Sequence, residues 1–295
     1  MAAIGLALSR LDESFGEDQG LDLPGIGLVT GGALGLVWGL VRGNAVGWGS
    51  REVIAALMAG VVLLLGFAAW ERRAREPMLP MSFFHSRAFS AAVAASFLLF
   101  AALYGSVFFM AQFMQTALGY EPFEAGLMLI PWIATLLVIA PVAGALGDRI
   151  GERPLVVGGL AINAVGLAAI ALIADPDLSY WQLLPALLVA GVGASAAIPV
   201  VQTALIGAVD ESAVGKASGA NNMSQELGGA FGVAILVAVF SAAGGYALVQ
   251  AFSEGFVSAL AACAALALLG AAASLALPKR RRRIEPDPQW GAPAR

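Results

Sequence analysis

The chain has 295 residues, of which 59% are hydrophobic and only 12% are charged. Soluble proteins carry about 25% charged residues, so this composition excludes an ordinary soluble domain. The net charge of -4 carries little information, because the location of the charges matters more than their sum. Apolar windows of about 18 residues or more recur along the chain, and each predicts a membrane-spanning helix.

In chain order, residues 1–22 come first. Their apolar run is short and has no basic leader, so they do not resemble a signal peptide. We expect 1–22 to be the end of a preceding helix and a cytoplasmic linker. Two spans then lie within 23–70, a basic cytoplasmic linker covers 71–87, six further spans fill 88–277, and a basic cytoplasmic tail covers 278–295. The eight predicted spans are 23–41, 53–70, 88–113, 123–146, 155–174, 181–206, 217–243 and 254–277.

All eight spans should be helices, because an isolated strand in lipid leaves backbone groups without hydrogen-bond partners. The predicted fold class is therefore an all-α polytopic membrane protein. Pro131 and Pro141 lie inside the fourth span and Pro199 inside the sixth. Neighbouring helices in a membrane bundle can satisfy the carbonyls that these prolines leave free.

The basic residues predict the orientation. If the chain starts in the cytoplasm and the spans alternate, fourteen of the sixteen Lys and Arg residues fall on the cytoplasmic side. Only Arg42 and Arg51 fall outside. This bias predicts that both termini are cytoplasmic. The basic residues on the predicted cytoplasmic side are Arg10, Arg72, Arg73, Arg75, Arg87, Arg149, Arg153, Lys216, Lys279, Arg280, Arg281, Arg282, Arg283 and Arg295.

Two charged segments have alternative interpretations. The tail "PKRRRR" could recognise anionic lipid or could simply anchor the topology. Glu71 and Glu76 flank the sequence "RRAR", and we expect both to be solvated charges at the membrane interface. One histidine, His85, and one cysteine, Cys263, leave no set of ligands for a metal. We therefore expect no metal, and we also expect no bound cofactor and no nucleic-acid partner for this membrane protein.

The segment "GALGDRIGERP", residues 144–154, is a charged island between the fourth and fifth spans. Gly144 and Gly147 would allow two helices to approach closely, and Pro154 suits the first turn of the next helix. Asp148 would lie just before that helix, where its charge meets the positive end of the helix dipole. Such an island can hold two helices together on one face of the membrane.

The island resembles the loop signature of the major facilitator superfamily. The resemblance implies that this loop belongs to a cytoplasmic gate. The matching residues are Gly144, Leu146, Asp148, Arg149, Gly151 and Arg153.

Three further stretches, 70–90, 112–132 and 216–235, resemble the fourteen-span drug:proton antiporters of that superfamily. These antiporters have two six-helix halves with two extra helices between them. The resemblance implies that 23–41 and 53–70 are the extra helices and that 88–277 is the C-terminal half. The N-terminal half is then absent, and it becomes an expected partner because the substrate path of the family lies between the halves.

A polar stripe on the seventh span is the main candidate for chemistry. Glu226 lies ten residues after Lys216, about 15 Å into the span at helical rise. Intramembrane acids usually face a cavity or a partner, so Glu226 is a candidate for taking up and releasing a proton. A structural hydrogen bond between helices is the alternative. The stripe comprises Ser218, Asn222, Gln225, Glu226 and Gly229.

Other polar residues are further candidates for the cavity, with plain helix–helix contact as the alternative. They are Tyr104, Gln112 and Gln115 in the third span and Gln202 in the sixth. Gly228 and Gly232 form a small-xxx-small pair that predicts close helix packing.

Three functions are candidates for this sequence. The favoured one, implied by the resemblance, is proton-coupled efflux of hydrophobic or drug-like molecules by alternating access, here by an incomplete chain in the plasma or inner membrane. The second is a non-transporting module or scaffold that pairs with another half-transporter. The third, an intramembrane enzyme, would need a nucleophile with a base, paired acids or a metal cluster. With one His, one Cys and one convincing buried acid, we expect no enzyme.

Overall fold

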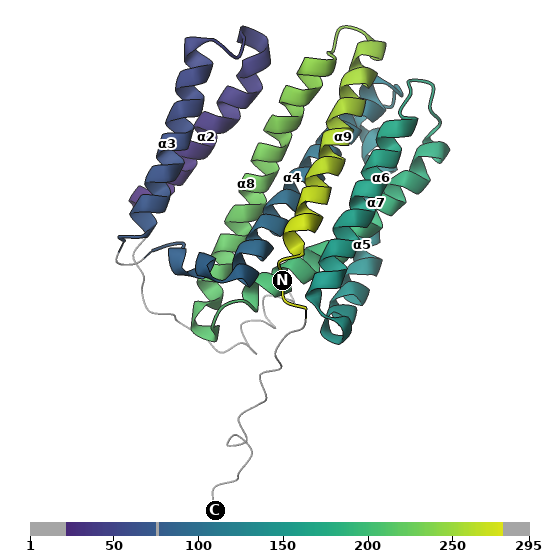
Figure 1. Cartoon of the computed structure of the whole chain (residues 1–295). Helices are drawn as coiled ribbons and strands as arrows, with labels where there is room; N and C mark the ends of the chain where they lie inside the picture. Colours follow the sequence, from purple (N-terminus) through teal and green to yellow (C-terminus); the bar gives the residue numbers. More distant parts are fainter. Residues whose placement is uncertain (1–21, 75–76, 280–295) are drawn as a thin grey trace, which may run out of the picture.

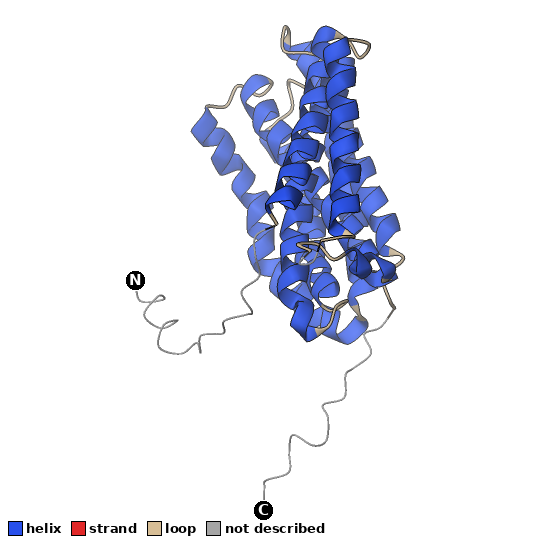
Figure 2. Cartoon of the chain, turned by 90° about the vertical axis from the view of Figure 1, so that its left-hand side faces the viewer, coloured by secondary structure: helices blue, strands red, loops and turns tan. Residues whose placement is uncertain are grey.

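The computed structural model describes residues 22–74 and 77–279, and these form helices joined by short loops without any strand (Figures 1 and 2). Eight helices in the described part are long and apolar enough to cross a membrane. The predicted fold class and the eight spans are therefore confirmed. The helices are α2 (Leu23–Val46), α3 (Arg51–Glu71), α4 (Arg87–Thr116), α5 (Pro122–Ile150), α6 (Glu152–Ile173), α7 (Tyr180–Ile206), α8 (Val214–Ala243) and α9 (Val249–Ser274), with short 3-10 turns η1 (Met81–His85) and η2 (Glu211–Ala213).

Several predictions fall on residues outside the described part. They concern the end of a preceding helix within 1–21, the charges at 75–76, and the basic tail from 280 onward.

Polar side chains cap the starts of several helices, among them α3 and α7. Ser50 accepts a hydrogen bond from the Val53 N–H at the start of α3. Ser179 and Gln182 form a reciprocal capping box at the start of α7. Such caps satisfy N–H groups that the first turn of a helix leaves without partners. The capped starts lie at the ends of short loops, so consecutive helices are held antiparallel.

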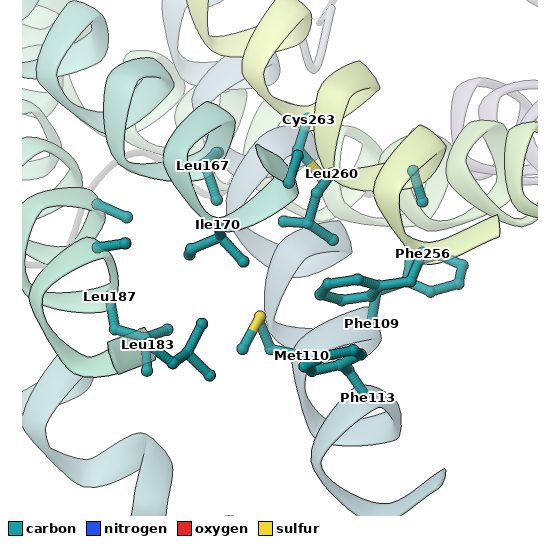
Figure 3. Close-up of a cluster of buried hydrophobic side chains, with 14 of the residues drawn as sticks. Phe109, Met110, Phe113, Leu167, Ile170, Leu183, Leu187, Phe256, Leu260 and Cys263 are labelled. Carbon is teal, nitrogen blue, oxygen red and sulfur yellow. The ribbon is translucent and has the colours of Figure 1, made fainter. Parts of the chain in front are cut away.

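Helices α4 to α9 all contribute buried side chains to an apolar interior, and Figure 3 labels those from α4, α6, α7 and α9. The rings of Phe113 on α4 and Phe256 on α9 stack with centroids 4.2 Å apart. Ile170 from α6 and Leu183 from α7 are fully buried in the same cluster. Because lipid tails are as apolar as these side chains, close packing rather than transfer from water stabilises this interior.

Glycine allows the closest helix crossings. A Cβ on Gly159 of α6 would lie 2.8 Å from the carbonyl oxygen of Gly193 on α7, so no side chain fits there. Asn163 fastens the same crossing by donating a side-chain hydrogen bond of 2.8 Å to the Ala190 carbonyl. At the crossing of α8 and α4, a Cβ on Gly232 would overlap the backbone of Ala101. The predicted packing role of Gly232 is therefore confirmed.

Helices α2 and α3 form a separate hairpin beside α8 (Figure 1). We call it the α2–α3 hairpin and call α4–α9 the six-helix unit. The two hairpin helices meet through glycines, since a Cβ on Gly35 would lie 3.0 Å from the Ala56 carbonyl oxygen. At one end of the hairpin, the side-chain amide of Asn44 donates a hydrogen bond to the Ala238 carbonyl of α8.

At the other end of the hairpin, the structure corrects one prediction. Glu71, expected to be a solvated interface charge, is only 2% exposed. Its carboxylate accepts a hydrogen bond of 3.1 Å from the Leu79 N–H. The neighbouring Arg72 and Arg73 are exposed, so these two arginines are solvated while the acid beside them is not.

Candidate functional site

The polar stripe predicted on α8 is divided between two environments. Asn222 and Glu226, one turn apart, are exposed, whereas Ser218 and Gln225 are half-buried. The Gln225 amide nitrogen is buried without a hydrogen-bond partner in the described part of the chain. The stripe therefore consists of two exposed residues, Asn222 and Glu226, beside two half-buried ones, Ser218 and Gln225.

The last stripe residue, Gly229, is buried under the ring of Tyr104 from α4. Tyr104 is itself 40% exposed and packs edge-on against Phe100 with centroids 5.6 Å apart. Because Gly229 lies one helical turn after Glu226, the structure brings Tyr104 to the same part of α8 as the exposed acid. Ser218, Asn222, Gln225, Glu226 and Tyr104 thus belong to one region where α4 and α8 meet.

The remaining polar candidates do not join this region. Gln112 lies near the other end of α4 and accepts a 2.7 Å hydrogen bond from the Tyr246 hydroxyl in the α8–α9 loop. The Gln115 amide donates to the Ala111 carbonyl within its own helix. Gln202 is half-buried near the end of α7. The structure therefore does not assemble all eight polar candidates into one cluster.

Tyr246 lies outside the membrane-spanning helices, and its burial raises the pKa of the phenol above the ordinary value. Its ring also packs against Phe240, with centroids 4.9 Å apart. Gln112 is thus part of a contact that holds the α8–α9 loop on α4. The amide nitrogen of Gln112 is nevertheless buried without a hydrogen-bond partner in the described residues.

Two polar residues that the sequence reasoning missed join α8 to α4. The Ser96 hydroxyl donates a 3.0 Å hydrogen bond to the Asn221 side chain, and the Ser224 hydroxyl donates one of 3.0 Å to the Val93 carbonyl. Asn221 and Ser224 are buried and share a face with Gly228, which packs on Phe97. The three-and-four spacing of these small and polar residues was the available signal.

The island 144–154 forms a tight connection between α5 and α6. Gly151 adopts a φ of 92°, a left-handed conformation that strains any residue with a side chain. Its N–H donates a hydrogen bond of 2.9 Å to the Gly147 carbonyl, and α5 ends there. Leu146 and Arg149 are exposed and Arg153 is half-buried. Gly151 thus permits the abrupt change of direction between the two helices.

Two details of the predicted island are wrong. Gly144 faces open space, and a Cβ on Gly147 would make only an ordinary contact of 3.7 Å with Leu155, so neither glycine is needed for a close approach among the described residues. Asp148 lies in the last turn of α5, and Glu152 is the acidic residue in the first turn of α6. Glu152, rather than Asp148, is therefore the acidic residue at the start of α6.

Comparisons with known proteins identify the family to which this chain belongs. The model of the Major Facilitator Superfamily matches residues 23–233 and 92–294 of the chain. The chain belongs to the Major Facilitator Superfamily. The resemblance to this superfamily is thereby confirmed, and the eight apolar helices agree with a multi-pass membrane protein.

Curated relatives within the superfamily are named for drug resistance and export. The tetracenomycin C resistance and export protein of Streptomyces glaucescens is 31% identical over 239 residues, which cover 80% of this chain and 44% of that protein. The multidrug resistance protein Stp of Mycobacterium tuberculosis is 31% identical over 238 residues, covering 80% and 44%. The puromycin resistance protein pur8 of Streptomyces alboniger is 31% identical over 247 residues, covering 82% and 49%. The chain spans about half the length of these relatives.

Proposed function

We propose that this chain forms part of a proton-coupled exporter of hydrophobic or drug-like small molecules that works by alternating access. The names of the relatives support the substrate class. The proton gradient across the plasma or inner membrane would supply the energy, without a bound cofactor. The clustering of basic residues on alternate loops supports a cytoplasmic position for both termini.

The exposure of Glu226 is the observation that carries the proposal. Glu226 lies twelve residues after the first residue of α8, about 18 Å along the helix, and thus near the middle of the span. A carboxylate that faces lipid at this depth is costly. We infer that this side of α8, with Asn222 beside Glu226 and Tyr104 of α4 nearby, lines a path for protons or substrate.

A second six-helix half would cover the rest of this face. In the most apolar stretch of α5 only 17% of the residues are buried, compared with 56% for α4. Leu137 and Val138 of α5 are 80% and 66% exposed, and Phe108 of α4 is 41% exposed. The proposed occupant is the N-terminal half of the same transporter. The competing function is a non-transporting membrane module or scaffold that pairs with another half-transporter.

The size of the native product separates the two functions. An antibody against residues 284–295 would be used to blot membranes from the source cells. A band at the mass of a fourteen-span protein supports the exporter. A band near 30 kDa, the mass of this chain, favours the scaffold unless a separate six-span polypeptide co-purifies with it.

Glu226→Gln is expected to abolish proton-coupled efflux while leaving the protein folded in the membrane, because glutamine keeps the shape of the side chain and cannot release a proton. Efflux of a fluorescent organic cation from vesicles with an imposed pH gradient measures this. Glu254→Gln, which alters an exposed acid on α9, is the matched control and should transport normally. Wild-type efflux by Glu226→Gln would remove Glu226 from the mechanism.

The gate function of the island is tested at Gly151. Gly151→Ala should slow transport severalfold, because alanine at a φ of 92° strains the connection between α5 and α6. Gly119→Ala imposes a similar strain at a φ of 73° in the α4–α5 loop, at the other end of α5. Equal slowing by both variants would contradict a specific role of the 144–154 island in gating.

A further inference from the structure

Two acidic residues meet where the α2–α3 hairpin begins and ends. Asp22 caps the start of α2, and Glu71 is the last residue of α3. We call Asp22 and Glu71 the carboxyl pair. The pair lies at the end of the hairpin from which the chain continues through η1 to α4 (Figure 1). It is remote from Glu226, which lies in the middle of α8.

Each member of the carboxyl pair has one oxygen with hydrogen-bond partners and one without. One Asp22 oxygen, Oδ1, accepts hydrogen bonds from the Gly25 N–H at 2.9 Å and from the Trp70 indole N–H at 2.8 Å. One Glu71 oxygen, Oε2, accepts the Leu79 N–H at 3.1 Å. The other two oxygens, Asp22 Oδ2 and Glu71 Oε1, are buried and have no partner in the described part of the chain.

The two carboxyl groups are neighbours, because the Trp70 indole that bonds Asp22 belongs to the residue directly before Glu71. Ionised carboxylates can only accept hydrogen bonds, so neither group can satisfy the other while both are ionised. Two buried carboxylates would also repel each other, and like charges that share a site resist simultaneous ionisation. A single proton removes both problems, because it turns one of the unpartnered oxygens into a donor to the other.

Lys216, near the start of α8, is the basic residue that acts on the Glu71 carboxylate most clearly. Its ammonium group attracts the pair but forms no salt bridge within 4.0 Å of Glu71 among these residues. No group of three or more metal-ligating side chains occurs in the described part either. A proton is therefore the ligand that fits the two unpartnered oxygens.

We propose that Asp22 and Glu71 bind one shared proton, and that this proton fastens the inner end of the α2–α3 hairpin to the segment that leads into α4. The segment is held through Leu79, whose N–H bonds Glu71 and whose side chain is 5% exposed. Leu79 packs in one cluster with Phe67 of α3 and Phe89 of α4. Protonation of the pair thus governs a contact that joins the hairpin to the six-helix unit.

Loss of the proton to water leaves two buried carboxylates, whose repulsion and desolvation favour separation. The hydrogen bond from Asn44 to α8 at the far end of the hairpin contains no titratable group. That end should stay attached at high pH while the inner end loosens. The hairpin would then pivot about its outer end, independently of proton transfer at Glu226.

Infrared spectroscopy of the purified chain in lipid tests the shared proton. A protonated carboxylic acid has a carbonyl band that ionised carboxylates lack. We expect the wild-type protein to show such a band at neutral pH, and expect both Glu71→Gln and Asp22→Asn to lose it, because the new amide supplies the missing donor. Glu52→Gln, at an exposed acid on α3 paired with Arg42, is the matched control and should retain the band.

Two infrared outcomes would overturn the proposal. Absence of the carbonyl band in the wild-type protein would mean that the carboxyl pair is ionised or holds a metal cation. Persistence of the band in Asp22→Asn would mean that Glu71 is protonated alone, without sharing. Neither result depends on transport, so the carboxyl pair and the proposed function can fail separately.

Limited proteolysis tests the structural consequence. Trypsin cleavage after the exposed Arg72 and Arg73 should increase severalfold from neutral to alkaline pH in the wild-type protein, after correction with an unfolded substrate. In Glu71→Gln the increase should disappear, because glutamine donates a hydrogen bond without titrating. Circular dichroism would confirm that the variant is folded. An equal increase in both proteins would refute the pH-dependent attachment.

Discussion

The six-helix unit and the α2–α3 hairpin are both made of apolar helices, yet different contacts stabilise them. In the six-helix unit, large side chains such as Phe113 and Phe256 fill an interior to which all six helices contribute. In the hairpin, two helices meet through glycines, and only 28% and 17% of their most apolar stretches are buried. The contacts that join the hairpin to its neighbours include polar groups at its two ends. Similar hydrophobicity therefore produces one unit with a packed interior and one that depends on a few directional contacts.

The largest effect is expected from a substitution that disrupts the packing of the six-helix unit. Gly159→Leu should destabilise the protein by about 3 kcal/mol, because a side chain would collide with the Gly193 backbone of α7. Gly158→Leu changes the adjacent residue of the same helix, where nothing lies within 4 Å of a Cβ, and should be nearly neutral. Thermal unfolding in detergent compares the two variants.

Hydrogen exchange would locate the damage caused by Gly159→Leu. Exchange should rise in α6 and α7 and remain unchanged in the α2–α3 hairpin. Equal destabilisation by Gly158→Leu and Gly159→Leu would mean that helix propensity or lipid contact, rather than the α6–α7 crossing, sets the stability of the unit.

A smaller effect is expected at the end of the hairpin where Asn44 contacts α8. Asn44→Leu removes the hydrogen bond to the Ala238 carbonyl and should cost about 1 kcal/mol. Amides of α2 and α3 should then exchange about fivefold faster, while those of α4 to α9 keep their rates. Hydrogen-exchange mass spectrometry measures both sets in one experiment.

Trp48→Phe is the matched control for Asn44. It removes the indole hydrogen bond to the Asn44 side chain but leaves the bond from Asn44 to α8. Exchange in the hairpin should change less than in Asn44→Leu. If Trp48→Phe had the larger effect, the α2–α3 loop rather than the contact with α8 would stabilise this end of the hairpin.

The spans could be predicted from the sequence because lipid imposes one requirement on each of them, a long apolar helix. The predicted ends were less accurate, as α9 runs over Val249–Ser274 rather than 254–277. Hydropathy detects the stretch that lies in lipid, whereas the helix itself ends where backbone hydrogen bonds and caps end it.

The contacts of individual polar residues could be predicted less well. Helix α8 carries small and polar residues on more than one side, so its sequence does not reveal that Asn221 and Ser224 face α4 while Asn222 and Glu226 are exposed. The burial of Glu71 depends on Asp22 and Leu79, which only the folded chain brings to it. Neighbouring arginines made a solvated charge the natural expectation.

The smallest expected effect concerns a loop contact within the six-helix unit. Tyr246→Phe removes the hydrogen bond to Gln112 but keeps the ring that packs on Phe240 and Phe252. Because the residue is 60% exposed and water can replace part of the bond, the expected loss is about 0.5 kcal/mol at neutral pH. Thermal unfolding of the variant beside the wild-type protein measures it.

The pH dependence of the same variant separates this contact from the carboxyl pair. Burial raises the pKa of Tyr246 above its ordinary value of about 10, so the folded state keeps the phenol proton longer than the unfolded state. The resulting stability is fully present below pH of about 10 and is lost as the pH rises through the folded pKa. Wild-type stability should therefore fall more steeply than that of Tyr246→Phe in this alkaline range, with parallel curves at neutral pH. Divergence already near neutral pH would assign the difference to another group, because a phenol with a raised pKa cannot titrate there.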